Sequence, residues 1–220
     1  MKRIISLLCV GALSVTMTAC GSDKKAFETS KAAYDNIQIA YEITEQFGGD
    51  IYEAWRLGIY EDDEILDGGV RFLAEELSLS ESEIRDGVAY TVASITGSDW
   101  DELSESEKNK YTSNADSFFS IMEDSLFSFC VSSVSGAYIV NGKVEEAQTA
   151  LDSAKTQMKE LSENYSDYEH PNLKGYYTTT SSYFNFCQNP DGSFEQVKNT
   201  INDYRNDARD YISDLDYIFD

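Results

Sequence analysis

The amino-acid sequence predicts an all-α protein, a single antiparallel bundle of long helices that carry a heptad pattern. Only two prolines occur among 220 residues, and both stand at expected helix boundaries. No segment alternates apolar and polar residues as a half-buried strand would. Apolar residues recur instead at spacings of three and four, which places them on one face of a helix. A hydrophobic content of 41% with 13% aromatic residues suffices for one packed core and argues against disorder.

The first two helices are expected ahead of the first capping signal. An apolar stripe from Phe27 to Tyr41 predicts a helix over residues 26–47. The pair Gly48-Gly49 either ends this helix or lies inside a longer one, and the sequence leaves both alternatives open. Residues 63–78 have the pattern of a second helix.

Capping boxes predict where the next helices begin. In this motif a Ser at the N-cap and a Glu three residues later satisfy each other's backbone N–H groups. Two such pairs occur, Ser80 with Glu83 and Ser104 with Glu107. The first opens a helix that we expect to end near Thr96. The second opens a longer helix, which the apolar spacing extends as far as Asn141-Gly142.

Three further helices complete the expected bundle. Residues 144–168 and 194–218 carry apolar side chains at gaps that alternate between three and four, and a helix over 172–188 lies between them. Ser193 with Gln196 marks the start of the last helix. Strict heptad spacing predicts long helices that pack side by side at a shallow angle.

From residue 26 to residue 220 we expect one domain, because no fixed-period repeat or low-complexity tract divides this part of the chain. A split near Gly97 is the alternative.

The N-terminus has the architecture of an export signal. Lys2 and Arg3 are followed by an apolar stretch from Ile4 to Val15 and by small residues before Cys20. The apolar stretch is shorter than the roughly 20 residues that a membrane-spanning helix needs.

This segment resembles the bacterial lipoprotein signal, whose lipobox ends in a small residue followed by a modified Cys; the small residue here is Ala19. The resemblance implies removal of residues 1–19 and a diacylglyceryl group on Cys20. It also implies a body anchored to the outer face of the bacterial cytoplasmic membrane, with residues 20–25 as a short tether. An ordinary signal peptide with a chance cysteine is the alternative.

Cys130 and Cys187 lie on apolar faces of two expected helices. If three consecutive antiparallel helices turn near Asn141-Gly142 and His170, both thiols lie opposite residue 153 of the middle helix. A bridge requires Cα atoms within about 7 Å, and export permits oxidation. We therefore expect a disulfide, with two buried free thiols as the alternative.

Charge and motif content exclude several function classes. A formal charge of −23 makes nucleic acid an unsuitable partner. The single histidine, His170, precedes a proline as in a turn before a helix. Neither a nucleophile elbow nor a phosphate-binding glycine loop occurs. The acidic clusters at residues 61–64 and 99–102 lack the calcium-loop pattern and are typical of solvated helix starts. We expect no catalytic residues, metal or cofactor.

Two side-chain groups are candidates for binding. Aromatic residues crowd around one expected turn: Tyr165, Tyr168, Tyr176, Tyr177 and Tyr183. They form either bundle packing or a recognition patch for a peptide or a sugar. The last helix adds an acidic row: Asp203, Asp207, Asp210 and Asp214. This row is either a solvated face or the docking face for a basic partner.

Beyond the signal, the chain generically resembles the uncharacterised acidic helical lipoproteins of Gram-positive-type envelopes, a likeness that implies no activity. We expect a lipid-anchored, non-catalytic interaction module on the cell surface that binds a protein, a peptide or a wall polymer. The alternative is a small-ligand receptor that works with an envelope transporter. An envelope enzyme would need a cleft with converging acids.

Overall fold

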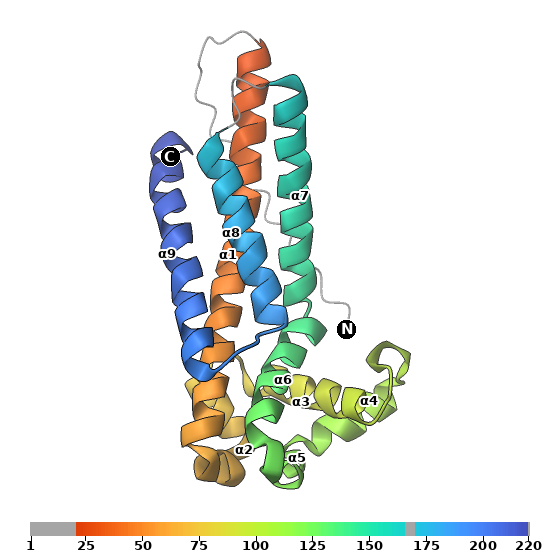
Figure 1. The fold of residues 1–220 in the computed structure, drawn as a ribbon. Coiled ribbons are helices and arrows are strands. Elements are labelled where there is room, and N and C mark those ends of the chain that lie inside the picture. The colour runs from red at the N-terminus through yellow and green to blue at the C-terminus, as the bar shows by residue number, and fades with distance from the viewer. Residues whose placement is uncertain (1–20, 166–169, 220) are drawn as a thin grey trace.

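The computed structural model describes residues 21–165 and 170–219, which are helical and contain no strand, so the predicted all-α bundle is confirmed. Its long helices are α1 (Gly21–Tyr60), α7 (Lys143–Asn164), α8 (Pro171–Gln188) and α9 (Phe194–Phe219). In Figure 1, α1 and α8 run from the upper end of the molecule to the lower, while α7 and α9 run the opposite way. Across the described residues, no helix is both long and apolar enough to cross a membrane.

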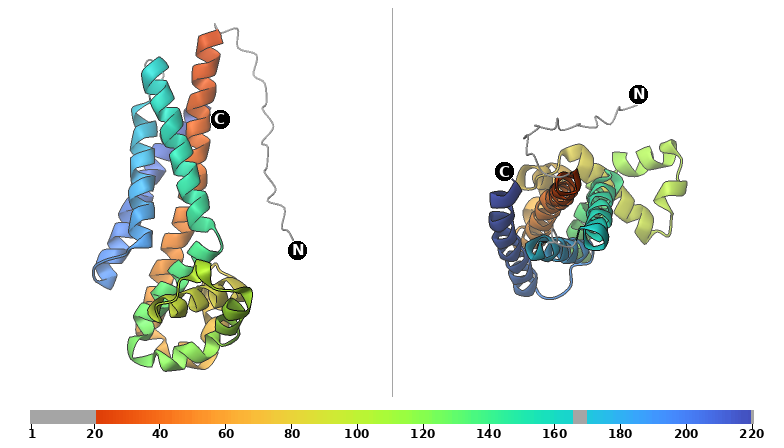
Figure 2. Two further views of the ribbon diagram at one scale, coloured as in Figure 1. Left: turned by 90° about the vertical axis from the view of Figure 1, so that its right-hand side faces the viewer. Right: turned by 90° about the horizontal axis from the view of Figure 1, so that it is seen from above.

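Shorter helices surround the lower end of α1. They are α2 (Asp62–Glu76), α3 (Glu81–Ile95), η1 (Trp100–Glu102), α4 (Glu105–Ser113), α5 (Ala115–Ile121), η2 (Glu123–Ser125) and α6 (Leu126–Val140). Figure 2 shows α1 passing through both halves of the molecule: the long helices flank its upper part and the short ones its lower part. Helix α1 packs on α7, α8 and α9 above and on α2 and α6 below, so it is the common axis of the fold.

Helix α1 is continuous through Gly48-Gly49, which settles the alternative left open by the sequence. A Cβ atom on Gly48 would collide with the hydroxyl of Tyr183, so this glycine serves close packing between α1 and α8. The expected tether is also helical from Gly21 onward. Lys25 pairs with Glu160 of α7 at 2.9 Å, so the first turns of α1 belong to the folded body.

The single helix expected from Ser104 to Asn141 was a wrong prediction, because the chain breaks into α4, α5 and α6. Asn114 stands between α4 and α5, and its side chain donates to the Lys110 carbonyl at 2.7 Å, a local bond that competes with helix continuation. The predicted capping boxes at Ser80/Glu83 and Ser104/Glu107 are present, as is the Ser193/Gln196 pair.

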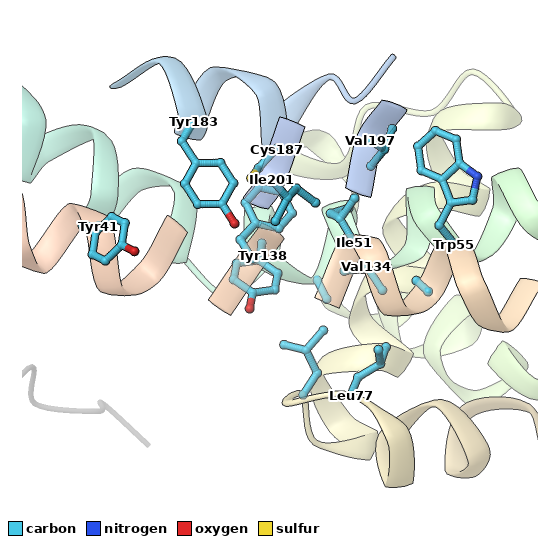
Figure 3. Close-up of a cluster of buried hydrophobic side chains, with 14 of the residues drawn as sticks. Tyr41, Ile51, Trp55, Leu77, Val134, Tyr138, Tyr183, Cys187, Val197 and Ile201 are labelled. Carbon is cyan, nitrogen blue, oxygen red and sulfur yellow. The ribbon is translucent and has the colours of Figure 1, made fainter. Parts of the chain in front are cut away.

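The expected disulfide between Cys130 and Cys187 is also wrong: both are buried free thiols among the described residues. The turn at Asn141-Gly142 does not reverse the chain, and α6 and α7 follow one another in nearly the same direction (Figure 1). Cys187 lies beside Tyr138 (Figure 3), its thiol 3.8 Å from the Thr44 carbonyl. Cys130 precedes Tyr138 by eight residues, about 12 Å along the helix axis.

The backbones of α3 and α6 approach very closely. A Cβ on Gly136 would lie 2.7 Å from the carbonyl oxygen of Gly87, and a Cβ on Gly87 would collide with the carbonyl oxygen of Ser133. Neither glycine can be replaced without separating the two helices. This contact fixes the geometry of the surface that α3 and α6 present together.

Candidate functional site

A groove of about 560 Å³ runs along the outer side of the α3–α6 pair. It also touches Trp55 of α1, Gln188 at the end of α8, and Pro190 in the loop between α8 and α9. Its volume falls within the roughly 300–1,000 Å³ that ligand pockets occupy.

One face of α6 forms the floor of the groove. The contributing residues are Phe127, Ser128, Val131, Ser132, Ser135, Gly136 and Ile139. Ile139 follows Phe127 by twelve residues in one helix, which gives the floor a length of about 18 Å. Helix α3 adds Tyr90, Thr91, Ser94 and Ile95 along one side. A floor of this length suits an extended ligand.

The groove is almost free of charge, although 26% of the chain is charged. Asp191 is the single charged residue among the described residues that line it. Residues 125–142, which include the whole of α6, contain no Asp, Glu, Lys or Arg. A helix that is uncharged all round is expected to be buried all round. Yet Ser132 and Ile139 of α6 are exposed in the groove.

Three of the serine hydroxyls of the groove present hydrogen-bond acceptors. They donate their hydrogens to nearby backbone carbonyls: Ser94 to Tyr90 at 3.0 Å, Ser128 to Ser125 at 2.9 Å and Ser135 to Val131 at 3.1 Å. A hydroxyl that donates in this way keeps its acceptor lone pairs. These hydroxyls therefore match ligand groups that donate.

Thr91 carries an unsatisfied hydroxyl at the groove. The residue is only 4% exposed, and its Oγ1 finds no hydrogen-bond partner in the described part of the chain. Buried polar groups in folded proteins are nearly always paired, because an unpaired one costs about 1–3 kcal/mol. Because the Oγ1 atom is itself covered, a ligand atom in the groove reaches this unpaired hydroxyl only after neighbouring side chains shift.

Two isoleucines flank the groove and face solvent. Ile95 is 61% exposed and Ile139 is 42% exposed. Together with the half-buried rings of Tyr90 and Phe127, they add apolar surface beside the hydroxyls. Mixed apolar and hydroxyl surface of this kind is typical of binding sites for uncharged ligands.

A second hollow, of about 350 Å³, lies between α1, α9 and the α2–α3 loop. Several of its charged groups have partners: Arg205 pairs with Glu45 at 3.6 Å, and Asp50 accepts a hydrogen bond from the backbone N–H of Ser78 at 2.9 Å. Across the described residues, no group of three or more His, Cys, Asp or Glu side chains could hold a metal ion. Two of the charged groups of this hollow, Arg205 and Asp50, are therefore already engaged with neighbouring groups.

Two of the five tyrosines expected to form either bundle packing or a recognition patch are excluded from the surface. Tyr176 and Tyr183 are fully buried in the core, and Figure 3 shows the Tyr183 ring pointing inward beside Ile201. Burial raises the pKa of both phenols. Tyr177 is partly buried, Tyr165 lies 5.9 Å below the ammonium of Lys25, and Tyr168 lies outside the described residues. Tyr176 and Tyr183 therefore serve packing of the bundle, the alternative to a recognition patch.

The acidic row on α9 is exposed over its full length: Asp203, Asp207, Asp210 and Asp214. Asp214 accepts a hydrogen bond from the Asn172 side chain at 2.9 Å. His170 stands at the N-cap of α8, with its ring edge-on to Phe219 at a centroid distance of 5.9 Å. Its place before Pro171 agrees with the predicted turn.

Sequence reasoning missed the groove. The signal that could have found it is the uncharged run at residues 125–142, whose serines a search for apolar stripes passes over. Comparison with protein families, curated proteins and solved structures found no match to this chain. The candidate site therefore rests on the geometry of the groove alone.

Proposed function

We propose that the protein is a lipid-anchored, extracytoplasmic binding protein whose working surface is the groove between α3 and α6. The observation that carries this proposal is an uncharged groove with an unsatisfied hydroxyl in its wall, on an otherwise strongly acidic chain. The residues that line the groove bring no pair of acid and base groups together, which favours binding over catalysis.

The anchor and the groove stand at opposite ends of α1. Cys20, the proposed lipidation site, immediately precedes the first residue of the helix. Trp55, which lines the groove, follows Gly21 by 34 residues in one continuous helix, a distance of about 51 Å. An anchored molecule standing on this end would hold its groove well away from the membrane and expose it to the surrounding envelope.

A small-ligand receptor is the second candidate, and the groove volume of about 560 Å³ favours it. The length and openness of the floor favour an extended or polymeric ligand instead. Ligand-induced thermal stabilisation separates the two, because a small ligand at 100 times its dissociation constant adds about 2.7 kcal/mol of stability.

The anchor is tested by fractionation of cells that produce the intact chain or its Cys20→Ala variant. The intact protein should be found in the membrane fraction, and the variant should lose its membrane association. An unchanged distribution of the variant would remove the anchor from the proposal.

The groove is tested by photo-crosslinking on intact envelopes. A photoreactive residue at Ser132, an exposed position on the groove floor, should give a defined adduct. The matched control carries the same residue at Ser162, an exposed position on α7 outside the groove. Equal adducts from both positions, or none from Ser132, would argue against a working surface at the groove.

A further inference from the structure

We propose that the ligand of the groove is a neutral oligosaccharide chain whose hydroxyl groups donate hydrogen bonds to the groove. This inference rests on the proposed function, and it assigns the ligand a chemical class. Three features carry it: the missing charge, the acceptor character of the hydroxyls, and the shape of the floor.

The charge distribution selects a neutral ligand. An anionic polymer would be repelled by a chain of net charge −23, and the groove holds no cation among its described lining residues to offset this repulsion. A cationic ligand would find Asp191 alone in the lining, although acidic residues are abundant elsewhere on the surface. The groove is therefore electrostatically suited to uncharged groups.

The hydrogen-bond inventory selects a donor-rich ligand. Ser94, Ser128 and Ser135 have given their hydrogens to carbonyls and can still accept. The unpaired Thr91 hydroxyl can accept or donate. Sugar hydroxyls supply donors along the whole length of a chain. The backbone N–H groups of a docked peptide helix are already bonded within that helix, so it would leave the groove acceptors unmatched.

The shape of the groove suits a linear chain of rings. Its floor is about 18 Å long, and the side chains of Ser128, Ser132 and Ser135 are small enough to let a ligand approach the α6 backbone. Tyr90 and Phe127 provide flat apolar surface for the apolar faces of sugar rings. Alternating apolar faces and hydroxyl edges of the ligand would meet the same alternation in the protein.

The test is binding of the folded protein to a panel of neutral and acidic oligosaccharides, with a Leu/Lys amphipathic helical peptide as a further probe. Binding should be confined to neutral oligosaccharides and should not change with salt, because no ion pairs form. Ser132→Arg, which blocks the floor at an exposed position, should abolish binding, whereas Ser162→Arg on α7 should not alter it. Per-O-methylation of a bound oligosaccharide removes its donors and should weaken binding by at least about tenfold.

A paired substitution tests the unsatisfied hydroxyl. Thr91→Val should lower affinity by about three- to tenfold, corresponding to one hydrogen bond. Ser133→Ala removes another buried unpartnered hydroxyl, one that does not line the groove, and should leave affinity unchanged. Melting curves of both variants show whether each remains folded, so that a change in affinity is not mistaken for a loss of folded protein.

Exclusive binding of acidic oligosaccharides or of the peptide, or no binding to any neutral oligosaccharide, would overturn the inference. If envelope crosslinks from Ser132 persist in that case, the groove remains a working surface and only the ligand class is wrong. If the crosslinks are also absent, the proposed function fails with it.

Discussion

The phenol of Tyr138 on α6 donates a hydrogen bond to a carboxylate oxygen of Asp50 on α1, at 2.8 Å inside the core. Burial is the main cause that raises the pKa of Tyr138, and the negative charge of Asp50 is the second. The phenol therefore remains a donor at neutral pH. Asp50 is 5% exposed and also accepts from the backbone N–H of Ser78 at 2.9 Å and from its hydroxyl. One buried carboxylate thus joins α1, α6 and the α2–α3 loop.

Asp50→Ala should destabilise the fold by about 2–4 kcal/mol, because it leaves the buried phenol of Tyr138 without an acceptor and also removes the two bonds from Ser78. Tyr138→Phe should cost only about 1 kcal/mol, because the two bonds from Ser78 remain. Urea denaturation of both single variants and of the double variant measures the coupling. Equal costs for the two single variants would mean that Asp50 is not the shared acceptor described here.

The two adjacent glycines of α1 should respond in opposite ways to alanine. Gly48→Ala places a methyl group against the Tyr183 ring and should cost about 1–3 kcal/mol. Gly49→Ala meets only the end of the flexible Arg205 side chain, at 3.2 Å, and should be neutral or stabilising by up to about 1 kcal/mol. Thermal melts of both variants test this contrast.

Tyr183→Phe supplies the control for this contact. The Tyr183 hydroxyl has no hydrogen-bond partner within the described chain, so its removal should be close to neutral alone. Combined with Gly48→Ala, it should recover part of the loss, because the nearest colliding atom is gone. A Gly48→Ala variant as stable as the parent would show that α1 and α8 are not in close contact there.

The thiols of Cys130 and Cys187 should remain unmodified in the folded protein. Burial raises the pKa of Cys130 to about 12 and raises that of Cys187 as well, so neither forms a reactive thiolate near neutral pH. Iodoacetamide labelling followed by peptide mass mapping should detect both cysteines only after unfolding, with no reductant needed. If labelling of the unfolded protein required a reductant, the two cysteines would be joined by a disulfide, contrary to the helix directions.

Helix starts were predictable from sequence where a local signal sets them. Ser80 and Glu83 form the capping box that the sequence predicts, and α3 begins between them. The direction of the chain at Asn141-Gly142 was not predictable, because Gly142 at φ 75° permits a turn without deciding its angle. That angle follows from the packing of both α6 and α7 on α1, which are contacts between distant segments.

The candidate site was less accessible to sequence reasoning than the fold. Exposed rows such as Asp203 to Asp214 follow from helical spacing, and the structure places them at the surface as the pattern indicates. A groove depends instead on which faces remain uncovered after α3, α6 and the loop at Pro190 have come together. Helical spacing alone does not contain that information, and it likewise could not show that Tyr176 and Tyr183 point inward.

The charge of Glu83 should stabilise the fold at neutral pH and lose this effect in acid. Burial alone would raise its pKa, but hydrogen bonds from the backbone and side chain of Ser80, together with Lys143 at 3.4 Å, outweigh burial and lower it. A carboxylate whose pKa is lower in the folded than in the unfolded state contributes stability above the unfolded value. That contribution disappears as the pH falls below 4.5 and through the folded pKa.

Glu83→Gln keeps the acceptor of the capping box and removes only the charge, so at pH 7 it should cost a few tenths to about 1 kcal/mol. The stability difference from the parent should shrink as the pH falls below 4.5, because the parent then loses the same charge. Glu81→Gln is the matched control, since Glu81 is exposed and its partner Arg85 stands 4.0 Å away. Urea denaturation at several pH values measures both differences. A Glu83→Gln deficit that stays constant from pH 7 into acid would show that the charge does not act through Ser80 and Lys143.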